Sequence, residues 1–152
     1  MNLLSDRFGP RPRLGIVVAS VNRPEYLRQL LSSLDTQSDK QFGVVLINNG
    51  GSTNTTVVME TWASKTTLNV EIQVRAANTP LCHITAAHSF DYVLMPGDDD
   101  ILARQAVEVI NRDLALTGRY SLLGYAASSM SSYGWRLPKN YRPCSSVDSG
   151  DE

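Results

Sequence analysis

Two short and continuously apolar runs constrain the fold of this chain more than any other feature. Residues 14–20 read LGIVVAS and residues 42–47 read FGVVLI. Runs of this length, rich in β-branched residues, are typical of strands buried on both faces of a parallel sheet. Between the runs, after Pro24, leucines recur with the spacing of an amphipathic helix. They are Leu27, Leu30, Leu31 and Leu34.

The alternation of strands and helices continues along the chain. The periodicity predicts a helix over 55–65, a half-exposed strand over 68–75, a short helix over 79–89, a strand over 91–96, a helix over 102–116 and a fifth strand over 120–128. Repeated alternation of this kind predicts an α/β domain with a mainly parallel sheet flanked by helices. We therefore expect an irregular lead-in over 1–13, one domain over 14–128, and an irregular tail over 129–152 whose last ten residues are disordered.

Composition excludes several classes of protein. The 152 residues are enough for one domain with a core, and the net charge of -1 gives no basic excess for binding nucleic acid. The first residues lack the apolar run of a signal peptide, and no later run is long enough to span a bilayer. Cys82 and Cys144 lack the spacing of a zinc site. We expect a cytoplasmic protein without a transmembrane segment.

Polar side chains follow every predicted strand at its carboxyl end. They occur in residues 19–23, 48–52, 75–78 and 97–100. The carboxyl ends of parallel strands share one edge of a sheet, which is where such sheets bind ligands. The sequence therefore predicts a crevice lined by amides, hydroxyls, arginines and carboxylates.

The sharpest feature of this crevice is a run of three aspartates, Asp98, Asp99 and Asp100. Adjacent like charges repel, so the run needs a compensating cation. Carboxylate oxygens are hard ligands suited to Mg²⁺ or Mn²⁺, with substrate phosphates completing the coordination. Alternatively, the aspartates cap a helix that starts near Ile101, where the helix dipole favours negative charge. A single aspartate would be enough for a cap.

Three segments together resemble the opening blocks of the family-2 glycosyltransferases, which have the GT-A fold. The segments are LGIVVASVNRPEYLRQLLSSL over 14–34, FGVVLINNGGSTNTT over 42–56 and DYVLMPGDDDIL over 91–102. In the family, the first strand ends in Thr-Tyr-Asn-Arg, the second in Asp-Asp-Gly-Ser-Thr, and the fourth in an Asp-x-Asp (DXD) motif. The resemblance covers residues 14–128 and implies a Rossmann-like GT-A domain that binds a nucleotide sugar.

The resemblance implies a nucleotide-diphosphate-sugar donor, and we expect a UDP-hexose such as UDP-glucose because that donor is common in the family. It implies that the donor nucleotide is bordered by Ala19, Ser20, Val21, Asn22 and Arg23. Asn49, with Asn48 as the alternative, would meet the uracil edge, and Arg75 would reach the base or the diphosphate. Val21 stands where the family often has tyrosine, and Asn49 where it has aspartate.

The resemblance also implies a divalent cofactor, Mn²⁺ or Mg²⁺, held by the three aspartates. Asp98 would lie near the ribose, Asp99 would bind the metal that bridges the phosphates, and Asp100 would support it. Gly97 stands where the commoner family motif has its first aspartate. His83 and His88 are expected to be surface or core residues, not metal ligands.

Family members continue into an acceptor-binding half that carries the catalytic base, and no such base is identified in this sequence. The expected function is a minimal glycosyltransferase (a hexosyltransferase) that transfers sugar to an unknown acceptor or slowly hydrolyses the donor. The alternatives are a non-catalytic nucleotide-sugar-binding module and an assembly protein with a vestigial site. Apolar residues over 120–128 would be exposed without an acceptor half, which predicts a homo-oligomer.

Overall fold

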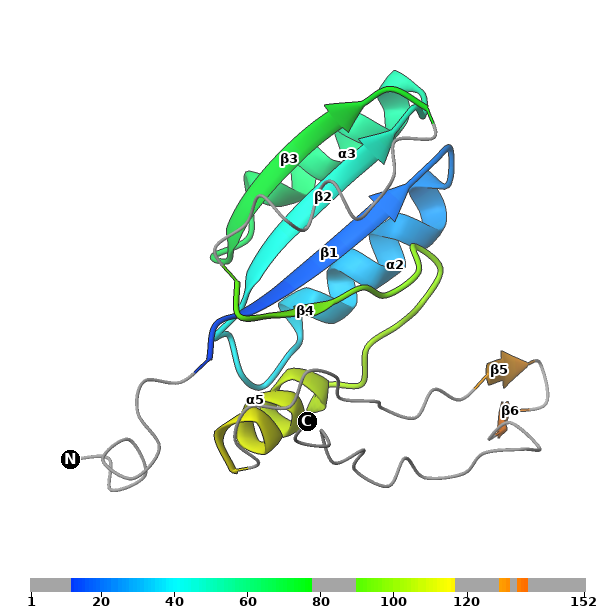
Figure 1. Cartoon of the computed structure of the whole chain (residues 1–152). Coiled ribbons are helices and arrows are strands. Elements are labelled where there is room, and N and C mark those ends of the chain that lie inside the picture. The colour runs from blue at the N-terminus through cyan, green and yellow to red at the C-terminus, as the bar shows by residue number, and fades with distance from the viewer. Residues whose placement is uncertain (1–11, 78–89, 117–128, 132–133, 137–152) are drawn as a thin grey trace, which may run out of the picture. The chain divides into compact units, whose positions relative to one another are not determined.

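The computed structural model describes residues 12–77, 90–116, 129–131 and 134–136 (Figure 1). The chain divides into two compact units, Met1–Leu116 and Thr117–Glu152. The sequence places the domain boundary later, after residue 128. The predicted helix over 79–89, with His83 and His88, and the predicted strand over 120–128 lie outside the described residues.

The first unit is built on a four-stranded sheet in which all strands are parallel. The strands are β1 (Leu14–Ser20), β2 (Gly43–Asn49), β3 (Asn69–Arg75) and β4 (Tyr92–Leu94), in the order β3-β2-β1-β4. The chain steps outward from β1 to β3 and then returns to the other side of β1. The predicted α/β class with a parallel sheet is confirmed, and β3 is half-exposed as its alternating sequence predicts.

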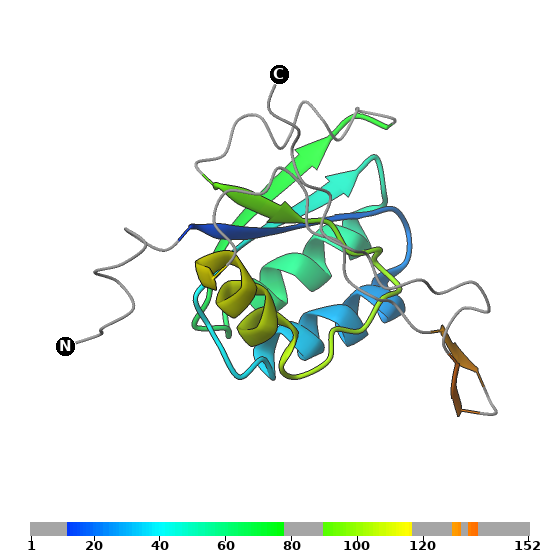
Figure 2. The ribbon, with the colours of Figure 1, turned by 60° about the horizontal axis from the view of Figure 1, so that its bottom comes forward.

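Three helices lie on one face of this sheet: α2 (Pro24–Asp35), α3 (Thr53–Ala63) and α5 (Ala106–Leu116) (Figure 2). The leucine stripe of α2 is buried, as its spacing predicts, and the helix begins at the predicted Pro24. The helices and the strands supply an apolar core. Its largest fully buried side chains are Ile16, Leu27, Leu30, Leu31, Leu34, Leu46, Ile47, Met59, Val17, Val18 and Val44.

A second, smaller cluster is formed by buried strand residues of β1 and β2. It consists of Val17, Val45 and Ile47, with Ala19 and Phe90 packed against it. Gly15 and Gly43 are register partners in the sheet, and the Phe90 ring lies against both. A Cβ atom at Gly15 would stand 2.2 Å from Phe90 Cδ2, and one at Gly43 would stand 2.8 Å from Phe90 Cε1. The two glycines therefore make room for an aromatic ring.

Replacing Gly15 with alanine is expected to destabilise the fold by about 1–3 kcal/mol, because the added methyl group overlaps the Phe90 ring. Urea denaturation measures this change, and a double-mutant cycle with Phe90→Ala isolates the overlap. In the Phe90→Ala background, Gly15→Ala should cost much less. Equal costs in both backgrounds would show that the ring does not determine this position.

Several element boundaries differ from those predicted. The helix expected over 102–116 begins at Ala106, and the strand expected over 91–96 spans only Tyr92–Leu94, since Pro96 cannot donate a backbone hydrogen bond. In the second unit, β5 (Ser129–Ser131) and β6 (Gly134–Arg136) pair antiparallel where the sequence predicts an irregular tail. None of the helices in the described residues is both long and apolar enough to cross a membrane.

Candidate functional site

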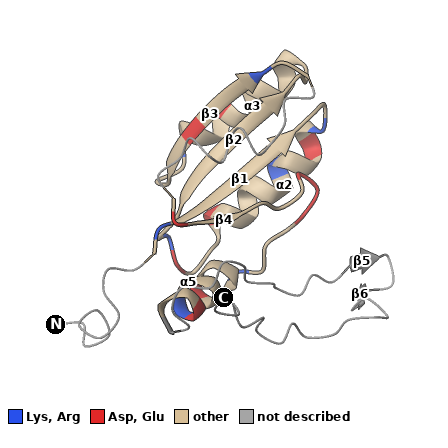
Figure 3. Cartoon of the chain, in the orientation of Figure 1, with Lys and Arg blue, Asp and Glu red and all other residues tan. Residues whose placement is uncertain are grey.

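The polar residues gather where the order of the strands reverses. β2 and β4 lie on opposite sides of β1, so the carboxyl ends of β1 and β4 frame the switch point of the sheet. Open parallel sheets bind their ligands in this position. Figure 3 shows the acidic loop after β4 close to the segment that joins β1 to α2, and side-chain hydrogen bonds connect the two.

Asp98 is the buried member of the acidic run, with 8% of its surface exposed. The Ser20 hydroxyl at the end of β1 donates a hydrogen bond of 2.7 Å to Asp98 Oδ2. Arg23 Nη1 lies 3.4 Å from Asp98 Oδ1. Both carboxylate oxygens therefore have partners from the β1 segment, so Asp98 joins the loop after β4 to the end of β1.

The other two aspartates differ from Asp98 in exposure and in their contacts. The Asp99 side chain is 55% exposed, and its Oδ2 lies 3.4 Å from the same Arg23 nitrogen. Asp100 Oδ2 accepts a hydrogen bond of 2.7 Å from the backbone N–H of Gly97, and its own N–H donates to the Gly97 carbonyl. Asp100 thereby closes its own turn. The alternative of a helix cap is wrong, because α5 begins only at Ala106.

The three carboxylates thus do not converge. In the part of the chain that the structure describes, no group of three His, Cys, Asp or Glu side chains could hold a metal ion. One accessible carboxylate, Asp99, and one buried neighbour, Asp98, remain at the switch point. This donor set suits a divalent cation that takes one or two carboxylates and completes its coordination with phosphate oxygens.

Asn48 is buried at the end of β2, with 1% of its surface exposed. Its Oδ1 accepts from the Gly51 N–H at 2.7 Å, and its Nδ2 donates to Thr56 Oγ1 at 2.8 Å and to the Ser52 carbonyl at 3.1 Å. The amide therefore holds the loop between β2 and α3. The burial of Asn48 does not fit the alternative in which it, and not Asn49, meets the uracil edge, whereas Asn49 is only partly buried.

Asn22 connects the loops after β1 and β2. Its backbone has φ 55, a left-handed conformation that asparagine tolerates better than most residues. Its Oδ1 accepts a hydrogen bond of 2.6 Å from the Ser52 N–H. The side chain predicted to border the nucleotide therefore also fixes the spacing of the two loops.

The remaining predicted residues are spread over this edge of the sheet. Val21 is exposed after β1, whereas Ala19 packs against the second cluster. Arg75 is the register partner of Asn49 at the end of β3. Its guanidinium donates to Gln73 Oε1 from Nε at 3.0 Å and from Nη2 at 2.7 Å. The contacts thus join Ser20, Arg23, Asp98 and Asp99 in one group. Among the described residues, the contacts of Arg75 lead to Gln73 and not to that group.

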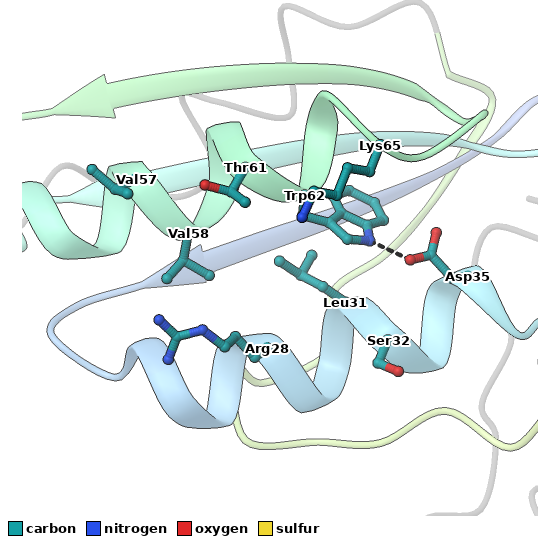
Figure 4. A pocket seen from close by; sticks show the side chains of 9 residues that line it. All are labelled: Arg28, Leu31, Ser32, Asp35, Val57, Val58, Thr61, Trp62 and Lys65. Carbon is teal, nitrogen blue, oxygen red and sulfur yellow. Dashed lines mark hydrogen bonds between the residues drawn. The ribbon is translucent and has the colours of Figure 1, made fainter.

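Sequence reasoning missed a groove of about 340 Å³ between α2 and α3 (Figure 4). Trp62 forms part of its wall and donates a hydrogen bond of 2.6 Å from Nε1 to Asp35 Oδ2. Thr66 Oγ1 donates to the other oxygen of Asp35 at 2.8 Å. None of the predicted donor-site residues lines this groove. Asp35 therefore ties the ends of the two helices together away from the acidic loop.

Comparison of the sequence with models of protein families and with curated proteins gives no match. Solved structures do match. A mannosyltransferase from Pyrobaculum calidifontis, PcManGT, in complex with GDP-Man and Mn²⁺, is 16% identical with a TM-score of 0.60, covering 70% of this chain and 32% of its own. TarS 1–349 from S. aureus is 17% identical with a TM-score of 0.60, covering 82% of this chain and 43% of its own.

A further TarS 1–349 structure, in complex with UDP, is 21% identical with a TM-score of 0.54, covering 66% of this chain and 31% of its own. At these low sequence identities, the similarity establishes a shared fold and nothing more. The chain has the Rossmann-like α/β fold of these glycosyltransferases, as the three sequence segments predict. It spans less than half of the length of each of them.

Proposed function

We propose that this chain binds a nucleoside-diphosphate sugar at the switch point between β1 and β4 and acts as the donor-binding domain of a glycosyltransferase. One observation carries the proposal. The buried Ser20–Asp98 pair and the exposed Asp99 carboxylate, which share Arg23 as a partner, lie at the position where parallel sheets bind ligands. The fold shared with sugar-transferring enzymes supports the same chemistry.

The residues have distinct roles in this proposal. Asp99, with Asp98 behind it, would hold Mn²⁺ or Mg²⁺, and the bound metal would neutralise charge on the diphosphate leaving group. Asn49 presents both a donor and an acceptor, which matches the N–H and carbonyl edge of uracil. The donor is a UDP-hexose such as UDP-glucose, while Val21 and Ala19 border the base.

The proposal is tested by calorimetric titration of UDP and UDP-glucose into the full chain, with and without Mn²⁺, and with GDP as the matched competitor. We expect micromolar UDP binding that depends on the metal, corresponding to about 8 kcal/mol. Binding of GDP alone would move the proposal to a guanine nucleotide. No binding of any of the three ligands with Mn²⁺ would overturn it.

Donor turnover then separates transfer from binding. Release of free glucose from UDP-glucose, or its transfer to an added acceptor, would support an enzyme. Tight binding without either product would support a nucleotide-sugar-binding module. A chain that binds no nucleotide but associates with itself in light scattering would support the assembly protein.

A further inference from the structure

Two ion pairs of the switch point share a single nitrogen atom. Arg23 Nη1 lies 3.4 Å from Asp98 Oδ1 and 3.4 Å from Asp99 Oδ2. A positive centre thus stands at equal distances from one oxygen of each carboxylate. Within the described part of the chain, no other cationic side chain forms an ion pair with either aspartate.

The two ion pairs of Arg23 are weak. Both are long for a charge-assisted hydrogen bond, which has a usual length of about 2.7–2.9 Å. The side chains of Arg23 and Asp99 are each 55% exposed, and exposed ion pairs contribute little to stability. The second oxygen of Asp98, by contrast, is held by Ser20 at 2.7 Å inside the protein. Asp98 can therefore remain in place when the guanidinium leaves, because Ser20 still holds its second oxygen.

The backbone of Arg23 takes part in the start of α2, whereas its side chain does not cap the helix. Arg23 precedes Pro24 at the start of α2, and its side chain makes no capping hydrogen bond. Its carbonyl accepts the first backbone bond of the helix from Leu27 at 3.1 Å. A movement of the guanidinium therefore requires only side-chain rotation, with no change in the fold.

We propose that Arg23 is a positioning residue that takes the place of the cation between Asp98 and Asp99 until the metal enters, and then turns to the diphosphate. This inference rests on the proposed function. A divalent cation and the guanidinium compete for the same two oxygens, because both are attracted by the same carboxylates. The diphosphate brings further negative charge, and guanidinium groups recognise phosphate oxygens by paired hydrogen bonds. The exchange keeps the acidic pair compensated with or without donor.

The exchange predicts opposite effects of one substitution on two ligands. In Arg23→Gln, Mn²⁺ alone should bind about threefold to tenfold more tightly, because the competing exposed ion pairs are removed. UDP added at saturating Mn²⁺ should bind about tenfold more weakly, because a charged phosphate contact is lost. Arg23→Lys keeps the charge and should restore both affinities in part.

The experiment is calorimetric titration of Mn²⁺ alone, and then of UDP at saturating Mn²⁺, into the wild type, Arg23→Gln and Arg23→Lys. Arg28→Gln is the matched control, since Arg28 lies on α2, the helix that Arg23 precedes, and pairs with Glu25. Thermal melting checks that every variant is folded.

Tighter Mn²⁺ and weaker UDP binding in Arg23→Gln alone would support the exchange. Unchanged Mn²⁺ affinity in Arg23→Gln, or the same changes in Arg28→Gln, would overturn it while leaving the proposed function intact. A wild type that binds neither Mn²⁺ nor UDP would overturn both.

Discussion

Replacing Asp99 with asparagine is expected to weaken Mn²⁺-dependent binding of UDP by at least about tenfold to a hundredfold. Losing even an outer-shell partner of a metal ligand weakens metal binding by about that factor, and Asp99 is the accessible carboxylate of the pair. The free energy of unfolding should change by less than about 0.5 kcal/mol, because the side chain is largely exposed. Calorimetric titration and urea denaturation measure the two quantities.

The neighbouring aspartates are the controls for this result. Asp100→Asn should retain most of the UDP affinity, because Asp100 is turned back to the Gly97 N–H. Asp98→Asn should lower stability as well as affinity, because it weakens a buried hydrogen bond from Ser20. If Asp100→Asn lost as much affinity as Asp99→Asn, the division of roles described for the three carboxylates would be wrong.

The sequence predicts β1, α2 and β2 correctly because the patterns that identify them are local. The leucines of α2 are spaced at one helical face, and Pro24 marks the start of the helix in the sequence itself. The β-branched runs of β1 and β2 likewise identify strands without knowledge of their neighbours. These elements formed as predicted because local pattern and tertiary packing agree.

The start of α5 could not be predicted in this way. Residues 102–105 carry a helical pattern, but the Leu102 N–H donates to Ser33 Oγ at 3.1 Å and the Gln37 amide donates to the Ala103 carbonyl at 2.9 Å. Both partners belong to a segment far away in the sequence. These tertiary hydrogen bonds take the place of a first helical turn over 102–105. They cannot be predicted from the local sequence, because their partners are distant in the chain.

The acidic site shows the same limit. The sequence brings Asp98, Asp99 and Asp100 to the edge of the sheet, but three identical neighbours give no sign of which one is buried. Ser20 determines which aspartate is buried, because its hydroxyl donates a hydrogen bond to Asp98. Ser20 lies on β1, and the pairing of β1 with β4 depends on the topology of the sheet. Likewise, the sequence does not show which of the two adjacent asparagines is buried. Successive residues of a strand point to opposite faces of the sheet, so Asn48 is buried and Asn49 is only partly buried.

Replacing the buried Asn48 with alanine is expected to destabilise the protein by about 2–4 kcal/mol. The substitution removes the hydrogen bonds that the buried amide makes with the Gly51 N–H, the Ser52 carbonyl and Thr56 Oγ1, and each such bond contributes about 0.5–1.5 kcal/mol. A small domain has a total stability of about 5–15 kcal/mol, so this loss is a large fraction of it. Urea denaturation at constant temperature measures the difference.

Asn49→Ala is the matched control, because it removes the same group from the neighbouring position of the same strand, where burial is only partial. We expect it to cost less than about 1 kcal/mol and to weaken UDP binding instead. Thr55→Val provides a second comparison: the Thr55 hydroxyl is buried and has no partner among the described residues, so its removal should be neutral or stabilising. If Asn48→Ala proved as mild as Asn49→Ala, the amide would not hold the loop after β2, and the alternative in which Asn48 meets the nucleobase would regain support.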